Sequence, residues 1–167
     1  MAEYSRPATL DDLKQLLTAL RDHHVEYLLI GGYALAAHGY QRATTDIDLL
    51  VPANADAGRR LREALLTLPD RAAAGLEPAW LEEGENIRVA DVFVIDVMVN
   101  ANGHSYESLR GHEQLLDLDG VPVHTLDLPG LLLTKQTARD KDVGDRAVLE
   151  RAIDELRRTR PDKPRDE

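Results

Sequence analysis

Apolar residues recur first at helical and then at strand spacing along the first half of the chain. Leucines at helical spacing predict a helix over about residues 10–23, and the short apolar run 25–30 predicts a strand that ends at two glycines. One or two helical turns over 33–38 and an apolar strand over 46–51 follow. A capping asparagine then begins a helix over about 55–68. After the first helix the order is β, α, β, α, which predicts a sheet flanked by helices.

The second half of the chain contains the clearest strand pattern. Residues 92–99 are strongly apolar, and one face of this strand would be wholly apolar but for Asp96. Before it, 76–90 has a weaker pattern that predicts two strands around a Glu-Gly turn. A helical turn over 105–111 and a hairpin over 115–125 with an Asp-Gly turn follow.

The last part of the chain is predicted to be helical. An aspartate cap and a proline in the first turn begin a helix over about 128–141, which leads with little break into a last helix to about residue 158. The whole pattern predicts an α/β (α+β) fold. Residues 1–126 form its core, a mixed, twisted sheet flanked by helices. Residues 127–159 form a C-terminal helical segment packed on this core, and the charged, proline-containing residues 160–167 form a frayed tail.

Composition and charge narrow the class of protein. The chain has 167 residues, of which 43% are apolar and 30% charged, as in one ordinary globular domain. It has no cysteine, which excludes a disulfide framework, a thiol nucleophile and cysteine-ligated zinc. We expect a cytoplasmic protein without a membrane segment, because the sequence lacks a signal-peptide pattern and a long apolar run. The net charge of −10 disfavours binding to long DNA.

Three aspartates in the strand patterns indicate a site for divalent metal ions. Asp46 and Asp48 lie on one face of their strand, because successive side chains point in opposite directions. Two neighbouring acids are costly without a cation, and Asp96 offers a third carboxylate. Such a set can hold two Mg²⁺ ions, or Mn²⁺ in their place, for phosphoryl transfer. The alternative for Asp96 is an acid at an exposed edge or one paired with an arginine.

Residues close to the acid pair fit the binding of a nucleoside triphosphate. Gly31 and Gly32 stand at a strand-to-helix turn, where backbone N–H groups can approach a phosphate, although such glycine pairs are often purely geometric. Arg42 and Thr44 place a cation and a hydroxyl just before Asp46. Arg42 would touch a phosphate or cap the loop, and both interpretations stay open.

Together these segments resemble a known family. Residues 31–40 (GGYALAAHGY), then Arg42, Thr44 and residues 46–51 (DIDLLV), are similar to the signature of minimal nucleotidyltransferases of the polymerase-β superfamily. The similarity is greatest to the toxin-type branch related to the AbiEii abortive-infection proteins. It implies the nucleotidyltransferase fold, and it implies that the glycine turn holds the triphosphate while the paired aspartates bind metal.

The same resemblance assigns expectations to later residues. It implies that Asp96 is the third carboxylate and that a downstream helix contributes a lysine, which Lys135 matches. Lys135, Arg139 and Asp142 are spaced i, i+4 and i+7, and therefore share one face of the predicted helix. Lys135 would hold a phosphate or extend its ammonium to solvent, with neither alternative favoured.

The implied reaction is transfer of a nucleoside monophosphate from a triphosphate such as ATP to an acceptor hydroxyl. The toxin-type branch implies RNA or tRNA as the acceptor and a cognate antitoxin protein as a partner. Two alternatives stay open. One is a small-molecule modifier akin to aminoglycoside nucleotidyltransferases, since an acidic protein suits cationic acceptors. The other is a nucleotide- or partner-binding module of a toxin–antitoxin pair without turnover.

Overall fold

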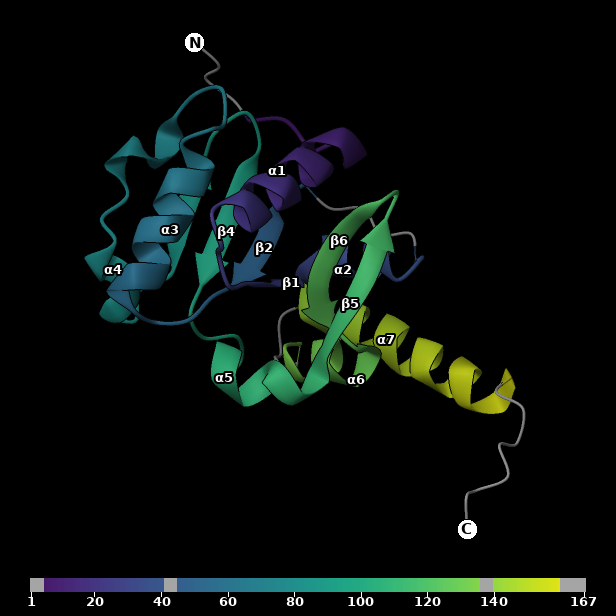
Figure 1. Ribbon diagram of the computed structural model, residues 1–167. Coiled ribbons are helices and arrows are strands. Elements are labelled where there is room, and N and C mark those ends of the chain that lie inside the picture. The colour runs from purple at the N-terminus through teal and green to yellow at the C-terminus, as the bar shows by residue number, and fades with distance from the viewer. Residues whose placement is uncertain (1–4, 41–44, 136–139, 160–167) are drawn as a thin grey trace.

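A six-stranded mixed sheet forms the centre of the computed structural model, which describes residues 5–40, 45–135 and 140–159. The strand order is β3-β4-β2-β1-β6-β5 (Figure 1). The strands are β1 (Leu28–Ile30), β2 (Ile47–Leu50), β3 (Ile87–Ala90), β4 (Val94–Met98), β5 (Glu113–Leu118) and β6 (Val121–Leu126). The helices are α1 (Leu10–Asp22), α2 (Gly31–Ala37), α3 (Ala55–Leu65), α4 (Ala79–Glu82), α5 (Tyr106–Leu109), α6 (Leu128–Leu133) and α7 (Asp140–Thr159), with short 3₁₀ helices η1 (Ala72–Gly75) and η2 (Arg110–His112). The predicted mixed sheet flanked by helices is confirmed.

The two central strand pairs set the geometry of the sheet. β2 pairs with β1 in antiparallel fashion and with β4 in parallel fashion, so the chain between β2 and β4 makes a long crossover that includes α3, η1, α4 and β3. β6 runs parallel to β1, and β3–β4 and β5–β6 are antiparallel pairs. The β5–β6 hairpin turns at Asp119 and Gly120, both with positive φ, as its Asp-Gly sequence predicts.

Two amphipathic helices cover part of the sheet. α1 and α3 lie side by side against it (Figure 1). The α1 leucines that recur at helical spacing are all buried in the core: Leu13, Leu16, Leu17 and Leu20. Asn54 caps α3 by accepting a hydrogen bond of 2.7 Å from the N–H of Ala57. The Thr9 hydroxyl caps α1 by accepting a hydrogen bond of 3.1 Å from the N–H of Asp12. Both helices therefore begin directly after a capping residue.

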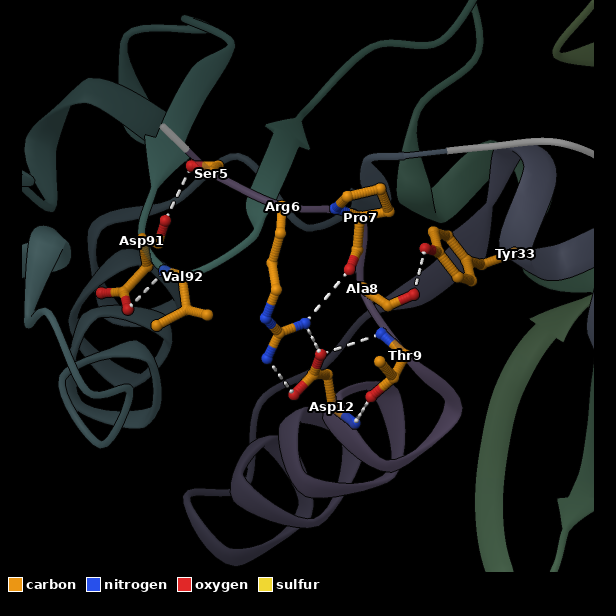
Figure 2. A network of polar contacts seen from close by, with 9 residues as sticks. All are labelled: Ser5, Arg6, Pro7, Ala8, Thr9, Asp12, Tyr33, Asp91 and Val92. Atoms are coloured by element: carbon orange, nitrogen blue, oxygen red, sulfur yellow. Dashed lines mark hydrogen bonds and ion pairs between the residues drawn. The ribbon is translucent and has the colours of Figure 1, made fainter. Parts of the chain in front are cut away.

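The segment before α1 connects distant parts of the fold. Figure 2 shows the Ser5 hydroxyl donating to the carbonyl of Asp91, and the Tyr33 hydroxyl on α2 donating to the carbonyl of Ala8. The Arg6 N–H also donates to the carbonyl of Val92, at 2.9 Å. The segment thereby links the β3–β4 turn to α2 and to the start of α1.

Only one of the two strands predicted over 76–90 is present. Its first part contains α4 instead of a strand, and only its second part forms a strand, β3. Pro78 stands at the start of α4, and Leu81 inside this single turn is fully buried. A methyl group on Gly58 of α3 would lie 2.6 Å from the Pro78 carbonyl oxygen. Close packing of α4 on α3, which is not visible in local spacing, therefore decides this segment.

The glycine turn also differs from the prediction. β1 is shorter than the apolar run 25–30, and α2 begins at Gly31 instead of Tyr33. Both glycines consequently belong to the first turn of the helix. The single-turn helix α5 confirms the helical turn that was predicted over 105–111.

The first C-terminal helix is shorter than predicted. α6 ends at Leu133, because Thr134 caps it and its hydroxyl donates to the carbonyl of Leu131 at 2.6 Å. Lys135 follows the end of α6 instead of lying within the helix predicted over 128–141, and its shared helical face with Arg139 and Asp142 stays a prediction. Arg139 and the Asp142 side chain lie outside the described residues. α6 packs on β6 and α7, and none of the described helices is both long and apolar enough to cross a membrane.

Candidate functional site

Two carboxylates and a guanidinium form a row across three neighbouring strands. Asp48 on β2 is the register partner of Asp96 on β4. Asp96 is in turn the register partner of Arg88 on β3. Register partners on neighbouring strands present their side chains on the same face. The prediction that Asp96 meets the acid pair from a neighbouring strand is therefore confirmed in its geometry.

Asp46 extends this row by one step along β2. It directly precedes the strand and lies two positions before Asp48, so both side chains lie on the same face. Ile47 and Leu49 point to the opposite face and are fully buried. The Thr45 hydroxyl donates to Asp46 Oδ1 at 2.9 Å. The buried apolar residues therefore anchor the strand that presents the acids.

Position 31 requires a glycine, because the backbone there lies close to the Asp48 carboxylate. A methyl group built on Gly31 would lie 2.2 Å from Asp48 Oδ2, which no side chain can tolerate without displacing the carboxylate. Gly31 also has φ of +77°, in the left-handed region that favours glycine. Gly32 lies behind it, buried in the first turn of α2. Both the proximity of the Asp48 carboxylate and the backbone conformation therefore favour glycine at position 31.

These residues converge on one cavity of about 500 Å³. Its lining includes the predicted residues Gly31, Asp46, Asp48, Asp96 and Lys135. Lys135 is 9% exposed, and its backbone N–H donates to the Leu132 carbonyl at 3.0 Å. A mostly buried lysine that faces a cavity does not match the interpretation that it extends into solvent. Arg42 and Thr44 lie outside the described residues, so their predicted roles stay predictions.

Arg88 was not among the predicted site residues. Its Nη2 lies 3.3 Å from Asp46 Oδ2, and its Nη1 lies 3.2 Å from Asp96 Oδ1. The pairing of Asp96 with an arginine, one of the two sequence-based alternatives, is therefore present. In the sequence, Arg88 stands out as a polar residue between the apolar Ile87 and Val89, but the strand pattern of this segment is weak.

Amide side chains line the part of the cavity beside β3, β4 and α6, and were also missed. Asn86, Asn100 and Asn102 all contribute to its lining. The Asn102 side-chain amide donates to the carbonyl of Leu133 at 2.9 Å, which connects the turn after β4 to the end of α6. The Asn100 side-chain oxygen accepts from the Gly103 N–H at 2.8 Å. These bonds hold the turn that forms one wall of the cavity.

The three aspartates fit divalent ions in residue type but not in their present side-chain positions. Carboxylate oxygens are the ligands that Mg²⁺ prefers, and the missing Cβ of Gly31 leaves space at Asp48 Oδ2, so the residue types fit. As the side chains stand, no group of three or more acids or histidines among the described residues surrounds a single ion position. Arg88 contacts two of the three acids. Metal binding at the three aspartates would thus require side-chain rearrangement.

Comparison with known proteins gives structural but not sequence matches. No protein-family model matches the chain, and no curated protein matches it in sequence. The solution structure of the antibiotic-resistance factor ANT(2'')-Ia aligns with 89% of this chain and 95% of its own, at 14% identity. Its TM-score of 0.47 is too low to support a conclusion.

A second structural match is closer. The crystal structure of TM1012 from Thermotoga maritima, a protein provisionally described as a nucleotidyltransferase, aligns with 87% of this chain and 92% of its own. The sequence identity is 12% and the TM-score is 0.56. Similarity at this level shows a shared architecture. The mixed sheet with its flanking helices is therefore the nucleotidyltransferase fold.

Proposed function

We propose that the protein is a metal-dependent nucleotidyltransferase that moves a nucleoside monophosphate from a triphosphate to an acceptor hydroxyl. One observation carries this proposal: Asp46, Asp48 and Asp96 come from two neighbouring parallel strands and line the same cavity. Gly31 and Lys135 line it as well. The nucleotidyltransferase fold supports the same class of reaction.

Each residue has a separate task in this proposal. Asp46 and Asp48 would hold both Mg²⁺ ions, and Asp96 would hold the one on the attacking side. When bound, the ions stabilise negative charge on the triphosphate and on the attacking oxygen. Gly31 leaves the space beside Asp48 open, and the Lys135 ammonium attracts the phosphates into the cavity.

The reaction itself exchanges one bond to phosphorus for another. The acceptor oxygen forms a bond to the α-phosphorus, and the bond from that phosphorus to the bridging oxygen of the β-phosphate breaks. Pyrophosphate leaves with the electron pair of that bond. The hydroxyl proton passes to the carboxylate of Asp96, which lines the cavity beside Asp48.

The resemblance of residues 31–51 to the toxin-type branch leads us to propose RNA or tRNA as the acceptor, with a neutralising antitoxin protein as partner. Small cationic acceptors are the competing class, which the net charge of −10 favours. A binding module without turnover is the third possibility. The acceptor and the presence of turnover are both open to direct measurement.

Incubation with each α-³²P-labelled triphosphate and Mg²⁺ tests the proposal. The acceptors are total tRNA, aminoglycosides and a protein extract, in separate reactions. We expect label to transfer to tRNA and expect Asp48→Asn to reduce the rate at least ~100-fold, since the loss of a metal ligand removes several kcal/mol of transition-state stabilisation. Asp22→Asn is the matched control, because Asp22 is an exposed acid at the end of α1.

Three outcomes separate the alternatives. Label on aminoglycosides instead of tRNA would replace the RNA acceptor by a small molecule. Label on protein would replace it by a polypeptide. If no acceptor gains label and wild type equals Asp48→Asn throughout, the enzymatic proposal fails for these acceptors.

A further inference from the structure

The side chain of Arg88 contacts two of the candidate metal-binding acids, Asp96 on β4 and Asp46 just before β2. Arg88 belongs to β3, which is the last strand at its edge of the sheet, and it is the register partner of Asp96. Its side chain is 61% exposed, whereas those of Asp46 and Asp96 are each 26% exposed. A long, exposed side chain on an edge strand has space to leave its partners without disturbing the core.

The guanidinium divides its N–H groups between two carboxylates. Nη2 lies 3.3 Å from Asp46 Oδ2, and Nη1 donates to both Asp96 oxygens, at 3.2 and 3.4 Å. One planar cation thereby offsets part of the negative charge of two acids. These oxygens are also those that would contact a divalent ion in the proposed function. A guanidinium and a metal ion cannot occupy the same side of a carboxylate together.

We propose that Arg88 is an internal counter-cation that competes with divalent metal ions for Asp46 and Asp96, and that metal binding displaces its guanidinium from both acids. This role rests on the proposed function, since it takes the two acids as metal ligands. Arg88 is a positioning residue here, because it acts through the carboxylates. Its presence lowers the affinity of the site for free metal ions.

Titration of the nucleotide-free protein with Mn²⁺, followed by electron paramagnetic resonance of the free ion, tests the competition. We expect Arg88→Gln to tighten Mn²⁺ binding roughly fivefold to tenfold, as for removal of a competing ion pair that is partly exposed to water. Arg59→Gln is the matched control, because Arg59 pairs with Asp56 and Glu63 on α3 and does not line the cavity. The control variant should retain the wild-type affinity.

A second measurement detects the displacement itself. The ¹H–¹⁵N signal of the Arg88 Nε–H group, assigned by its loss in Arg88→Gln, should move during titration with diamagnetic Mg²⁺ and reach a plateau as the site saturates. An Arg88 signal that stays constant to saturation would overturn the proposal. So would an Mn²⁺ affinity that is unchanged or weaker in Arg88→Gln, or Mn²⁺ binding in neither protein.

The two proposals fail in different ways. Tighter Mn²⁺ binding by Arg88→Gln together with no label transfer by wild type would sustain the role of Arg88 and reject the enzymatic reaction. Label transfer by wild type, together with equal Mn²⁺ affinities of wild type and Arg88→Gln, would sustain the enzymatic reaction and reject the role of Arg88. Thermal unfolding of each variant, measured in EDTA, shows that a changed affinity does not come from a changed fold.

Discussion

At the scale of single residues, the site is explained by alternation along one strand and register between strands. Alternation was visible in the sequence, because Ile47 and Leu49 interleave with the acids, and Asp96 interrupts an apolar strand face. Register was not visible. The same limit hid Arg88, whose role depends on the pairing of β3 with β4. The sequence thus predicts residue types well and cross-strand partners poorly.

Substitution of Gly31 should be severe even though the change is small. Gly31→Ala places a methyl group against Asp48 Oδ2 in a left-handed backbone conformation. Holding an alanine in the left-handed conformation costs about 1–2 kcal/mol of unfolding free energy, and the clash with the carboxylate adds to this cost. Urea unfolding measures the loss. Gly75→Ala is the control, because a methyl group there meets nothing within 4 Å among the described residues and should leave stability nearly unchanged.

A buried acid outside the cavity should contribute strongly to stability. Asp91 is 2% exposed, and its side-chain oxygens accept backbone N–H bonds from Asp70 (3.0 Å), Ala72 (2.8 Å) and Val92 (2.8 Å). Asp91→Asn replaces one acceptor oxygen by a donor that faces other donors, and should cost about 2 kcal/mol. Urea unfolding checks this value. A loss as small as that of exposed Asp22→Asn would contradict it.

At the scale of elements, helix starts that have a side-chain cap followed the sequence, whereas other boundaries depended on tertiary contacts. α1 and α3 begin at their capping residues, since a cap is a local hydrogen bond. α4 replaced a predicted strand because it packs closely on Gly58, and α6 ends at Leu133, whose carbonyl accepts from the distant Asn102 side chain. Short apolar segments carry too little periodicity to distinguish a helix turn from a strand without such contacts.

The start of α1 should give acid sensitivity to the fold. The guanidinium of Arg6, aided by the N–H and hydroxyl of Thr9, lowers the pKa of Asp12 from 3.8 to about 2 (Figure 2). A lowered folded-state pKa gives stability that is present above pH 3.8 and lost as the pH falls toward 2. Asp12→Asn should therefore be less stable than wild type at pH 6, with the difference shrinking between pH 4 and 2.

Urea unfolding over that pH range, at constant ionic strength, measures the effect. Asp22→Asn is again suitable as the control, since Asp22 is exposed and lies in the last turn of the same helix. If the difference in unfolding free energy between wild type and Asp12→Asn stays constant from pH 6 to pH 2, the acid sensitivity does not come from Asp12.

At the scale of the whole molecule, a strongly acidic chain concentrates three aspartates in one cavity. If these acids bind Mg²⁺, the ion must stabilise the folded state, because the unfolded chain does not bring them together. Mg²⁺ at 100 times its dissociation constant should add about 2.7 kcal/mol to the unfolding free energy. Thermal unfolding in Mg²⁺ and in EDTA measures the shift, which Asp48→Asn should abolish. Equal shifts in both proteins would indicate a general charge effect instead.

The parallel pairing of β2 with β4 has a consequence for folding kinetics. Asp48 and Asp96 meet only after the long crossover through α3, η1, α4 and β3 has closed, and contacts between distant parts of a chain form slowly. Arg88 and Asp96 lie on one antiparallel pair and are close in sequence, so their contact does not depend on closure of the long crossover. The antiparallel pair that supplies the third acid therefore also supplies a counter-charge, which reduces the repulsion between Asp96 and the acids of the neighbouring strand as they come together.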